Sequence, residues 1–224
     1  MSGLRWAALL ALAGWLAACA GAGPAGVLTR GGSGAKPRSL GLLYPQIEAG
    51  ALMVRGEWPG GRRFMGSEIL AVVHAAIRGN FNSHAAPEWR DLAEEKTGRE
   101  RIALLTTAML REYTLNGTIP VRLANELGRV AHVDAVVLVS IARFGPSDRQ
   151  MVLHSLAGDA RPTGAAGAGS WINCGVVCAV VKTPGGQLLW EGGALESVPS
   201  TAGTTEAAAQ SCVTRLMSAF PWRK

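Results

Sequence analysis

Histidine and cysteine are the residue types of this sequence best suited to catalysis or metal binding, and each occurs four times. No two histidines are spaced four residues apart, and none has a carboxylate at the spacing of a metal site. Cys174 and Cys178 form one Cys-x3-Cys pair without the second pair that a zinc site needs. The Gly-x-Ser-x-Gly motif of serine hydrolases is absent. The sequence therefore predicts a protein that is not an enzyme, with no catalytic residue, metal or cofactor.

Three of the cysteines raise the question of a disulfide. On an extended strand Cys174 and Cys178 face the same side, but at about 3.3 Å per residue their Cα atoms are roughly 13 Å apart, whereas a disulfide needs about 7 Å or less. Cys212 falls on a predicted terminal helix and can pair with Cys174 or with Cys178 in an oxidising compartment. The alternative is that all three are small buried hydrophobic side chains. The sequence leaves both alternatives open.

The fourth cysteine, Cys19, ends an apolar run at the start of the chain. A short positive segment, from Met1 to Arg5, precedes about a dozen apolar residues that begin at Trp6. This order of charge, apolar run and small residues is typical of a secretory signal, and the run is too short for a comfortable transmembrane helix. The sequence therefore predicts export.

The last residues of this run, Leu16-Ala17-Ala18-Cys19, resemble the lipobox of bacterial lipoproteins. The resemblance implies cleavage before Cys19 and acylation of its thiol and of the new amino terminus. An ordinary signal peptide with a cysteine at this position by chance is the alternative. In enteric lipoproteins an aspartate after the cysteine signals retention in the inner membrane, and Ala20 stands there instead. The resemblance thus implies a lipid anchor in the outer membrane, with the protein facing the periplasm.

The composition is that of a folded protein without the marks of nucleic-acid binding. Hydrophobic residues make up 48% of the chain and charged residues 17%, which fits a globular protein rather than a disordered one. The net charge is +6, but the basic residues are scattered and do not alternate with aromatic ones. After the signal, no apolar run reaches the roughly 18 residues of a spanning helix. We therefore expect the lipid to provide the membrane attachment, and no nucleic-acid partner.

The chain divides into a signal peptide (residues 1–18), a lipidated tether (19–38) and a single domain (39–224). The tether is rich in Gly, Ala and Pro, which predicts flexibility. In the domain, the β-branched run at 133–141 is apolar on both faces and predicts a central strand covered by helices. The other predicted strands are 40–44, 51–55, 151–156, 171–182 and 187–191, and the predicted helices are 67–78, one from a capping box of Thr97 and Glu100 to Asn116, 120–130 and 204–220. This order predicts an α+β fold, with helices packed on a mainly antiparallel sheet.

Two tryptophans in or beside predicted loops are candidates for contact with a partner. Trp58 precedes a Pro-Gly-Gly turn that continues into Arg62 and Arg63, and Trp89 follows Pro87. Large aromatic side chains in such positions often anchor a protein contact. The alternative, of equal weight, is that each ring folds back into the core. We name Trp58, Trp89, Arg62 and Arg63 as the candidate contact residues.

The middle of the chain, residues 97–143, resembles a group of bacterial envelope lipoproteins. In that group two helices are followed by a Gly-Ala-Asp-x-hydrophobic strand, which Val133-Asp134-Ala135-Val136 matches at the aspartate and the strand, with His132-Val133 in place of Gly-Ala. The group includes the curli-secretion channel lipoproteins and the activator lipoproteins of penicillin-binding proteins. No amphipathic pair of hairpins for a channel wall is visible here. The resemblance implies a helper or scaffold role, with no catalytic residues to carry over.

Together these features lead to one functional hypothesis and two alternatives. The leading hypothesis is a non-enzymatic outer-membrane lipoprotein that acts as an accessory or scaffold for an envelope assembly or secretion system. Its expected partners are the membrane and another envelope protein, with a homo-oligomer as a further arrangement. The first alternative is a lipoprotein that binds a small ligand or a cell-wall polymer through its basic residues and loop tryptophans. The second is an unrecognised hydrolase.

Overall fold

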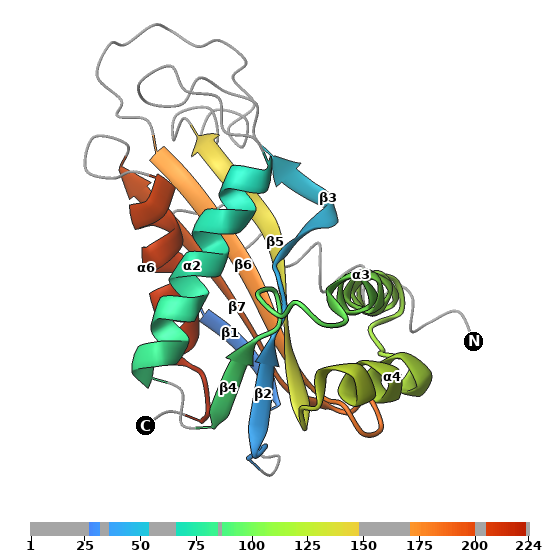
Figure 1. The fold of residues 1–224 in the computed structure, drawn as a ribbon. Coiled ribbons are helices and arrows are strands. Elements are labelled where there is room, and N and C mark those ends of the chain that lie inside the picture. Colours follow the sequence, from blue (N-terminus) through green and yellow to red (C-terminus); the bar gives the residue numbers. More distant parts are fainter. Residues whose placement is uncertain are drawn as a thin grey trace, which may run out of the picture.

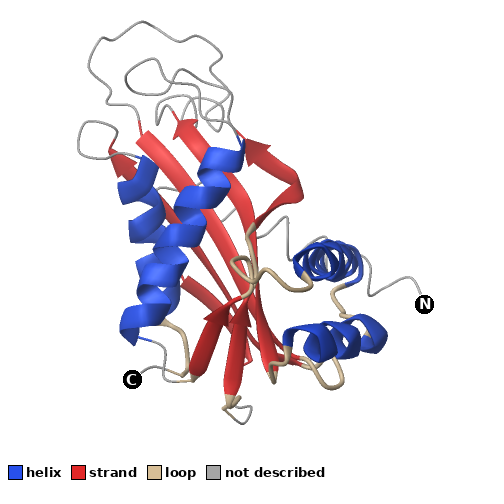
Figure 2. Ribbon diagram, viewed as in Figure 1, coloured by secondary structure: helices blue, strands red, loops and turns tan. Residues whose placement is uncertain are grey.

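The computed structural model describes residues 27–31, 36–53, 66–84, 87–147, 171–199 and 205–222. These residues form a mixed sheet of seven strands with helices against both faces (Figures 1 and 2). The strands are β1 (Val27–Gly31), β2 (Ser39–Leu42), β3 (Gln46–Met53), β4 (Glu88–Asp91), β5 (Ala135–Ser147), β6 (Trp171–Lys182) and β7 (Leu188–Pro199). The helices are α2 (Gly66–His84), α3 (Arg99–Asn116), α4 (Val121–Ala131) and α6 (Thr205–Ser218). The predicted α+β fold, with helices packed on a sheet, is confirmed.

Strand β5 is the centre of this arrangement, as its apolar sequence predicted. Val137 and Val139 lie in the core beneath α2 and α6, whereas Val136 and Leu138 lie in the core beneath α3 and α4. All four side chains are at most 1% exposed. Because successive side chains of a strand point to opposite faces, one β-branched run supplies both cores.

The sheet has a parallel and an antiparallel half, which meet at β5. The strand order is β1-β7-β6-β5-β2-β4, and β3 pairs with β5 outside this path. Strand β6 pairs antiparallel with both β5 and β7. On the other side, β2 and β3 pair in parallel with β5, and β4 pairs in parallel with β2. Pro45 lies between β2 and β3, which follow one another along the same edge of β5. Proline has no N–H to donate to the ladder, so the break in pairing falls at this residue.

Helices α2 and α6 lie side by side on one face of the sheet (Figure 1). Just beyond the C-terminal end of α6, the Phe220 ring contacts Phe81, Trp190 and Trp222, with ring centroids 5.3–5.4 Å apart. The α2 helix runs past the end expected at Arg78. Its Asn80 is buried and its side-chain amide donates to the carbonyl of Ala76 at 3.0 Å, so this asparagine does not end the helix.

Helices α3 and α4 cover the other face, next to the end of the sheet where β5 begins (Figure 1). The capping box predicted for Thr97 and Glu100 is wrong, because the N-cap residue of α3 is Gly98, in a left-handed conformation and without a side-chain cap. Glycine adopts this conformation without the steric cost that other residues incur. His132 ends α4 with φ 51°, and its N–H donates to Gly128 at 2.8 Å.

Strand β1 lies within the segment that the sequence predicted as a flexible tether. Residues Val27–Gly31 pair antiparallel with β7, from Val27 opposite Ala194 to Gly31 opposite Trp190. The expectation of a tether over the whole of residues 19–38 is therefore corrected for β1. Its sequence, VLTRG, has no strong apolar alternation, so the pairing rests on the backbone hydrogen bonds of an edge strand.

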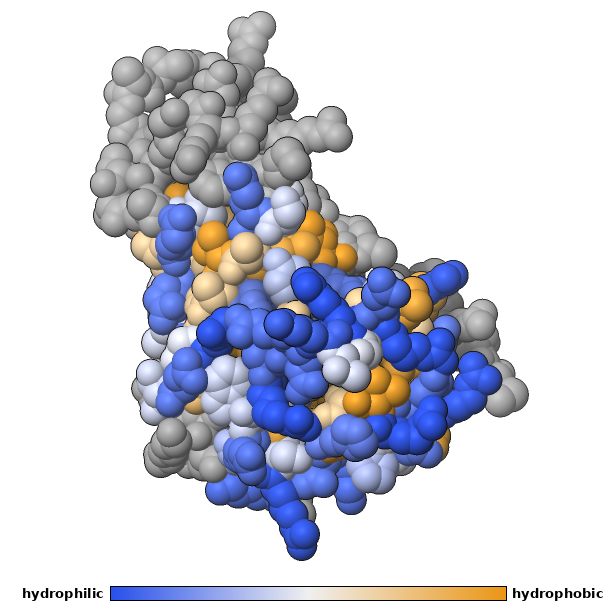
Figure 3. Space-filling view, viewed as in Figure 1, coloured by the Kyte–Doolittle hydropathy of each residue, from blue (hydrophilic) through white to orange (hydrophobic). Residues whose placement is uncertain are grey.

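The remaining differences concern element lengths and surfaces. β7 extends well beyond the predicted strand at 187–191, and β4 was not predicted. The predicted strand at 151–156 lies outside the described residues. Among the helices of the described part, none combines the length and the apolar character that a membrane crossing requires. In Figure 3 hydrophilic residues dominate the lower half of the described surface, and apolar residues gather mainly towards its upper end.

Candidate functional site

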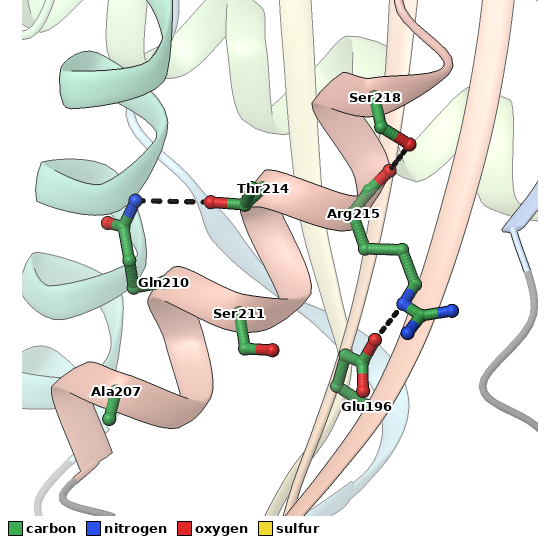
Figure 4. Close-up of a pocket in the computed structure, with 7 residues that line it drawn as sticks. All are labelled: Glu196, Ala207, Gln210, Ser211, Thr214, Arg215 and Ser218. Atoms are coloured by element: carbon green, nitrogen blue, oxygen red, sulfur yellow. Dashed lines mark hydrogen bonds and ion pairs between the residues drawn. The ribbon is translucent and has the colours of Figure 1, made fainter.

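One side of helix α6 and the last part of strand β7 form a groove of about 690 Å³ (Figure 4). Its residues on α6 recur at helical spacing, so they form one stripe, separate from the stripe that packs on the sheet. Ser211, Thr214 and Ser218 are the small polar side chains among them. The lining consists of Ala207, Gln210, Ser211, Thr214, Arg215 and Ser218 from α6 and Glu196 from β7.

An ion pair between Arg215 and Glu196 joins the two sides of the groove (Figure 4). The Glu196 side chain is 9% exposed and the Arg215 side chain 42%. A carboxylate so deeply buried needs a partner, and the guanidinium compensates its charge. Along the helix, Gln210 donates to the Thr214 hydroxyl at 3.2 Å, and the Ser218 hydroxyl donates to the carbonyl of Arg215 at 2.6 Å. The groove therefore offers hydroxyl, amide and guanidinium groups on a rigid helix.

Beside this groove, the last part of strand β7 has only one strand neighbour among the described residues. β1 pairs with β7 only as far as Ala194, whereas β6 pairs with it as far as Pro199. Within the described residues, positions 195–199 of β7 thus have a strand neighbour on one side only. The outward N–H and C=O groups of such an edge can pair with an additional extended chain. The groove and the edge together form a surface suited to a protein segment.

A second polar cluster lies where the parallel strands β2 and β4 end. Nε2 of His74, on α2, is 3.2 Å from Oδ1 of Asp91, the last residue of β4, and both side chains are about nine-tenths buried. Arg78, one turn further along α2, lies 3.9 Å from Asp91 and also pairs with Glu94. The Tyr44 ring, beyond β2, lies 5.0 Å from the imidazole, centroid to centroid.

The cluster connects α2 to the parallel strands, because basic side chains on the helix lie against carboxylates at and beyond the end of β4. Its members pair with one another: the guanidinium of Arg78 faces two carboxylates, and Asp91 also accepts the N–H of Ala93 at 3.0 Å. Carboxyl ends of parallel strands are common places for ligands, and a carboxylate beside a histidine can orient the ring for proton transfer. Across the described ranges, no three His, Cys, Asp or Glu side chains gather as metal ligands would.

Sequence reasoning misses this cluster because Asp91 lies in a charged stretch with Glu94 and Glu95, which is typical of a solvated surface. The Asp91 side chain is 8% exposed, whereas that of Glu94 is 59% exposed. Asp91 is buried because it is the last residue of β4, where it lies against His74 of α2. The sequence of this strand, EWRD, is largely charged and does not indicate a strand. The only signal in the sequence was the placement of His74 and Arg78 four residues apart, on one side of a predicted helix.

The structure describes one of the four candidate contact residues. Trp89 lies on β4, is half-buried and packs against Phe81, with ring centroids 5.7 Å apart in an edge-on arrangement. One side of the ring therefore belongs to the core, and its role in a partner contact stays a prediction. Trp58, Arg62 and Arg63 lie outside the described residues, as does the lipidation candidate Cys19.

The three other candidate residues, Cys174, Cys178 and Cys212, are free and buried. The sulfur of Cys212 lies 3.1 Å from the carbonyl oxygen of Cys174 and 3.4 Å from that of Ala194. A hydrogen bond with Cys212 and burial raise the pKa of the Cys174 thiol well above its ordinary value. Burial, with the charge of Glu191, raises the pKa of Cys178 to about 12. Thiols in such surroundings are poor nucleophiles.

No protein-family model and no curated protein sequence matches the chain. Similar solved structures include a PelC dodecamer from Paraburkholderia phytofirmans, with 12% identity, a TM-score of 0.44, and coverage of 89% of this chain and 99% of that one. Lipoprotein GNA1162 from Neisseria meningitidis has 15% identity, a TM-score of 0.39, and coverage of 82% and 95%. The hypothetical protein CT253 from Chlamydia trachomatis has 10% identity, a TM-score of 0.41, and coverage of 80% and 91%. With TM-scores below 0.5, these similarities assign neither a family nor a function to the chain.

Proposed function

We propose that this chain is a non-enzymatic lipoprotein of the bacterial outer membrane that faces the periplasm and serves as an accessory or scaffold in envelope assembly or secretion. The observation that carries the proposal is the N-terminal sequence, in which a charged start and an apolar run end in Leu16-Ala17-Ala18-Cys19. Acyl chains on Cys19 hold the protein at the membrane. The folded domain then docks a second envelope component.

The position of β1 supports the anchoring part of this proposal. Residues 20–26 alone separate Cys19 from Val27, the first residue of β1. Because an extended chain spans at most about 3.5 Å per residue, this segment can separate the anchor from the strand by at most about 28 Å. The β1–β7 edge of the sheet, with the α6 groove beside it, therefore stays close to the bilayer. A partner bound there is held at the membrane surface.

The groove and the open edge of β7 support the docking part. The groove is lined by short polar side chains on a rigid helix, and the edge offers backbone hydrogen-bonding groups over residues 195–199. Small-molecule sites are typically enclosed, whereas this groove is open to solvent. An extended segment of a partner can pair with β7 while its side chains contact α6.

A second candidate function is the binding of a cell-wall polymer or small polar ligand. The same groove favours it, because Gln210, Ser211, Thr214 and Arg215 offer hydrogen bonds to a hydroxyl-rich or acidic ligand. Isothermal titration of the purified protein with soluble cell-wall fragments separates the two functions. Saturable binding that is lost in Arg215→Ala would favour the ligand-binding function, and absence of heat would favour the accessory function.

The anchoring claim is tested by membrane fractionation of two variants. Cys19→Ala removes the acylated thiol, so we expect a soluble periplasmic protein, whereas wild type sediments with the outer membrane. Ala20→Asp retains the cysteine but introduces the inner-membrane retention signal, so in an enteric host we expect the protein to move to the inner membrane. Persistence of Cys19→Ala in the membrane fraction would contradict lipid anchoring.

The docking claim is tested by crosslinking the lipidated protein in intact envelopes, followed by purification and mass spectrometry. Ser211→Arg with Thr214→Arg fills the groove, and Leu104→Arg on the exposed side of α3 is the control variant, since its side chain is 65% exposed. We expect one envelope assembly to be recovered with wild type and with the control, and to be lost with the groove variant. Equal recovery with all three proteins would place the contact elsewhere.

A further inference from the structure

The structure contains Cys174 and Cys212 as neighbouring reduced thiols, and we propose that oxidation joins them in a disulfide that fastens helix α6 to the central sheet, while Cys178 stays a free thiol. The oxidising compartment that this bond requires rests on the proposed function. The two residues come from strand β6 and helix α6, and both are 0% exposed. Their contact brings together two positions that are 38 residues apart in the chain.

The geometry selects Cys174 over Cys178 as the partner of Cys212. Cys174 and Cys178 lie on the same face of β6, in the core that α6 covers. The Cys212 sulfur lies 3.1 Å from the carbonyl oxygen of Cys174. Cys212 also raises the pKa of the Cys174 thiol, whereas burial and the charge of Glu191 raise that of Cys178. The sequence left the choice between these partners open, and the contact of the Cys212 sulfur with the main chain of Cys174 favours Cys174.

The oxidation is a thiol–disulfide exchange with a disulfide oxidant, such as oxidised glutathione or a disulfide-bearing oxidoreductase. One cysteine loses its proton and attacks a sulfur of the oxidant, which releases one thiol and leaves a mixed disulfide. The thiolate of the second cysteine then attacks the protein sulfur of this intermediate and releases the second thiol. Two electrons and two protons pass from Cys174 and Cys212 to the oxidant, and one S–S bond forms in the protein.

The burial of both thiols determines when the bond can form. The raised pKa of Cys174 leaves little thiolate in the folded protein, and exchange requires a thiolate that the oxidant can reach. Oxidation therefore takes place before α6 packs on the sheet, or while the helix is open. Once α6 is in place, the same burial protects the disulfide from reductants.

The first test is peptide mapping of the full lipidated chain, extracted from envelopes into detergent with free thiols alkylated under denaturing conditions. We expect a peptide pair linked through Cys174 and Cys212, which separates on reduction, and an alkylated Cys178. A link between Cys178 and Cys212 would overturn the choice of partner. Alkylation of all three cysteines would contradict oxidation in the cell.

The second test separates this inference from the proposed export. The full chain is denatured, reduced and refolded in detergent with oxidised glutathione, which supplies the oxidant independently of any compartment. If the Cys174–Cys212 bond forms here but is absent from cellular protein, export has failed and the disulfide geometry stands. If oxidative refolding yields three free thiols, the disulfide is contradicted and the export proposal is unaffected.

The third test measures thermal stability with and without reductant. A bond across 38 residues restricts the unfolded chain, so we expect reduction to lower the Tm of wild type by about 10 °C. Cys178→Ala should show the same loss on reduction, even though its starting Tm differs. Cys174→Ala and Cys212→Ala should show no change on reduction. A response of either of these two variants equal to that of wild type would contradict the assigned pair.

Discussion

The two faces of the sheet are packed with different side chains. Beneath α2 and α6 the core includes large rings among its aliphatic side chains, with Phe81, Phe144, Trp190 and Phe220 at most 2% exposed, and it contains all three cysteines of the described residues. Beneath α3 and α4 the fully buried side chains are aliphatic. The first face also carries the groove and the His74 cluster. Buried aromatic rings are thus found on the face that also carries both polar sites.

Glycines allow close packing on both faces, at Gly192 against the Trp190 ring on the first face and at Gly128 and Gly41 on the second. A Cβ on Gly128, in α4, would lie 2.5 Å from the Cβ of Thr183, and a Cβ on Gly41 would lie 2.4 Å from Leu92. The Thr183 hydroxyl also donates to the carbonyl of Val133, across the start of β5. Gly128 lets α4 approach the sheet closely, whereas Gly192 makes room for the Trp190 ring on the first face. Enlarging Gly128 should therefore harm the second face, and truncating rings should harm the first.

The largest expected effect is the truncation of a ring in the aromatic core. Trp190→Ala removes a side chain that is 1% exposed and packs edge-on against Phe220. We expect a loss of about 4 kcal/mol in the free energy of unfolding, against about 3 kcal/mol for Leu127→Ala in the aliphatic core. Urea unfolding followed by circular dichroism measures both values. A larger loss for Leu127→Ala would contradict the greater weight given to the aromatic face.

The next effect concerns the charge cluster at the ends of β2 and β4. Asp91→Ala leaves His74 without its carboxylate and Arg78 with Glu94 alone, so we expect a loss of about 2–3 kcal/mol. Glu94→Ala is the matched control, because its side chain is 59% exposed, and it should cost less than about 1 kcal/mol. Chemical denaturation at pH 7 compares the two variants. Equal losses would indicate that Asp91 is not the central residue of the cluster.

A pair of glycine variants tests the packing difference directly. Gly128→Ala places a methyl group against Thr183, and we expect a loss of about 1–3 kcal/mol. Gly79→Ala, in the interior of α2, meets nothing within 4 Å and should stabilise the protein by about 0.5–1 kcal/mol through helix propensity. Thermal unfolding of both variants gives the two signs. Destabilisation by Gly79→Ala would show that α2 packs more tightly than described.

The smallest effect is a pH dependence on the second face. The hydrogen bond from Arg101 and the charges of Arg101, Arg129 and Arg122 lower the pKa of Glu126 below its ordinary 4.5. A depressed pKa contributes stability above pH 4.5 that is lost as the pH falls through the folded-state value. Glu126→Gln should therefore lower the Tm slightly at pH 7, and the difference from wild type should shrink towards pH 3. A difference that grows on acidification would reverse the assigned sign.

Much of the fold could be predicted from apolar pattern. The run at 133–141 identified the central strand, and residues 171–182 were predicted with the bounds that β6 has. Strand β4 could not be predicted, because its EWRD sequence carries charge and its pairing comes from the backbone of β2. Its Arg90 donates to the carbonyls of Ala131 and His132 at 2.6 and 2.8 Å, contacts that depend on residues distant in sequence.

The candidate site was less accessible to sequence reasoning. The stripe of mostly polar residues on α6 has no motif, and Glu196 lies on β7 beyond the strand end predicted at residue 191. The neighbour of Cys212 likewise depends on how α6 sits on β6. Cys19 is the opposite case, since its interpretation rests on local sequence alone.

Acylation of Cys19 is the claim on which the proposed function depends. The most direct measurement is mass spectrometry of the N-terminal peptide of the protein purified from membranes. The account predicts a peptide that begins at Cys19 and carries the added mass of acyl chains on that residue. An N-terminus at any other residue, or an unmodified Cys19, would contradict the account.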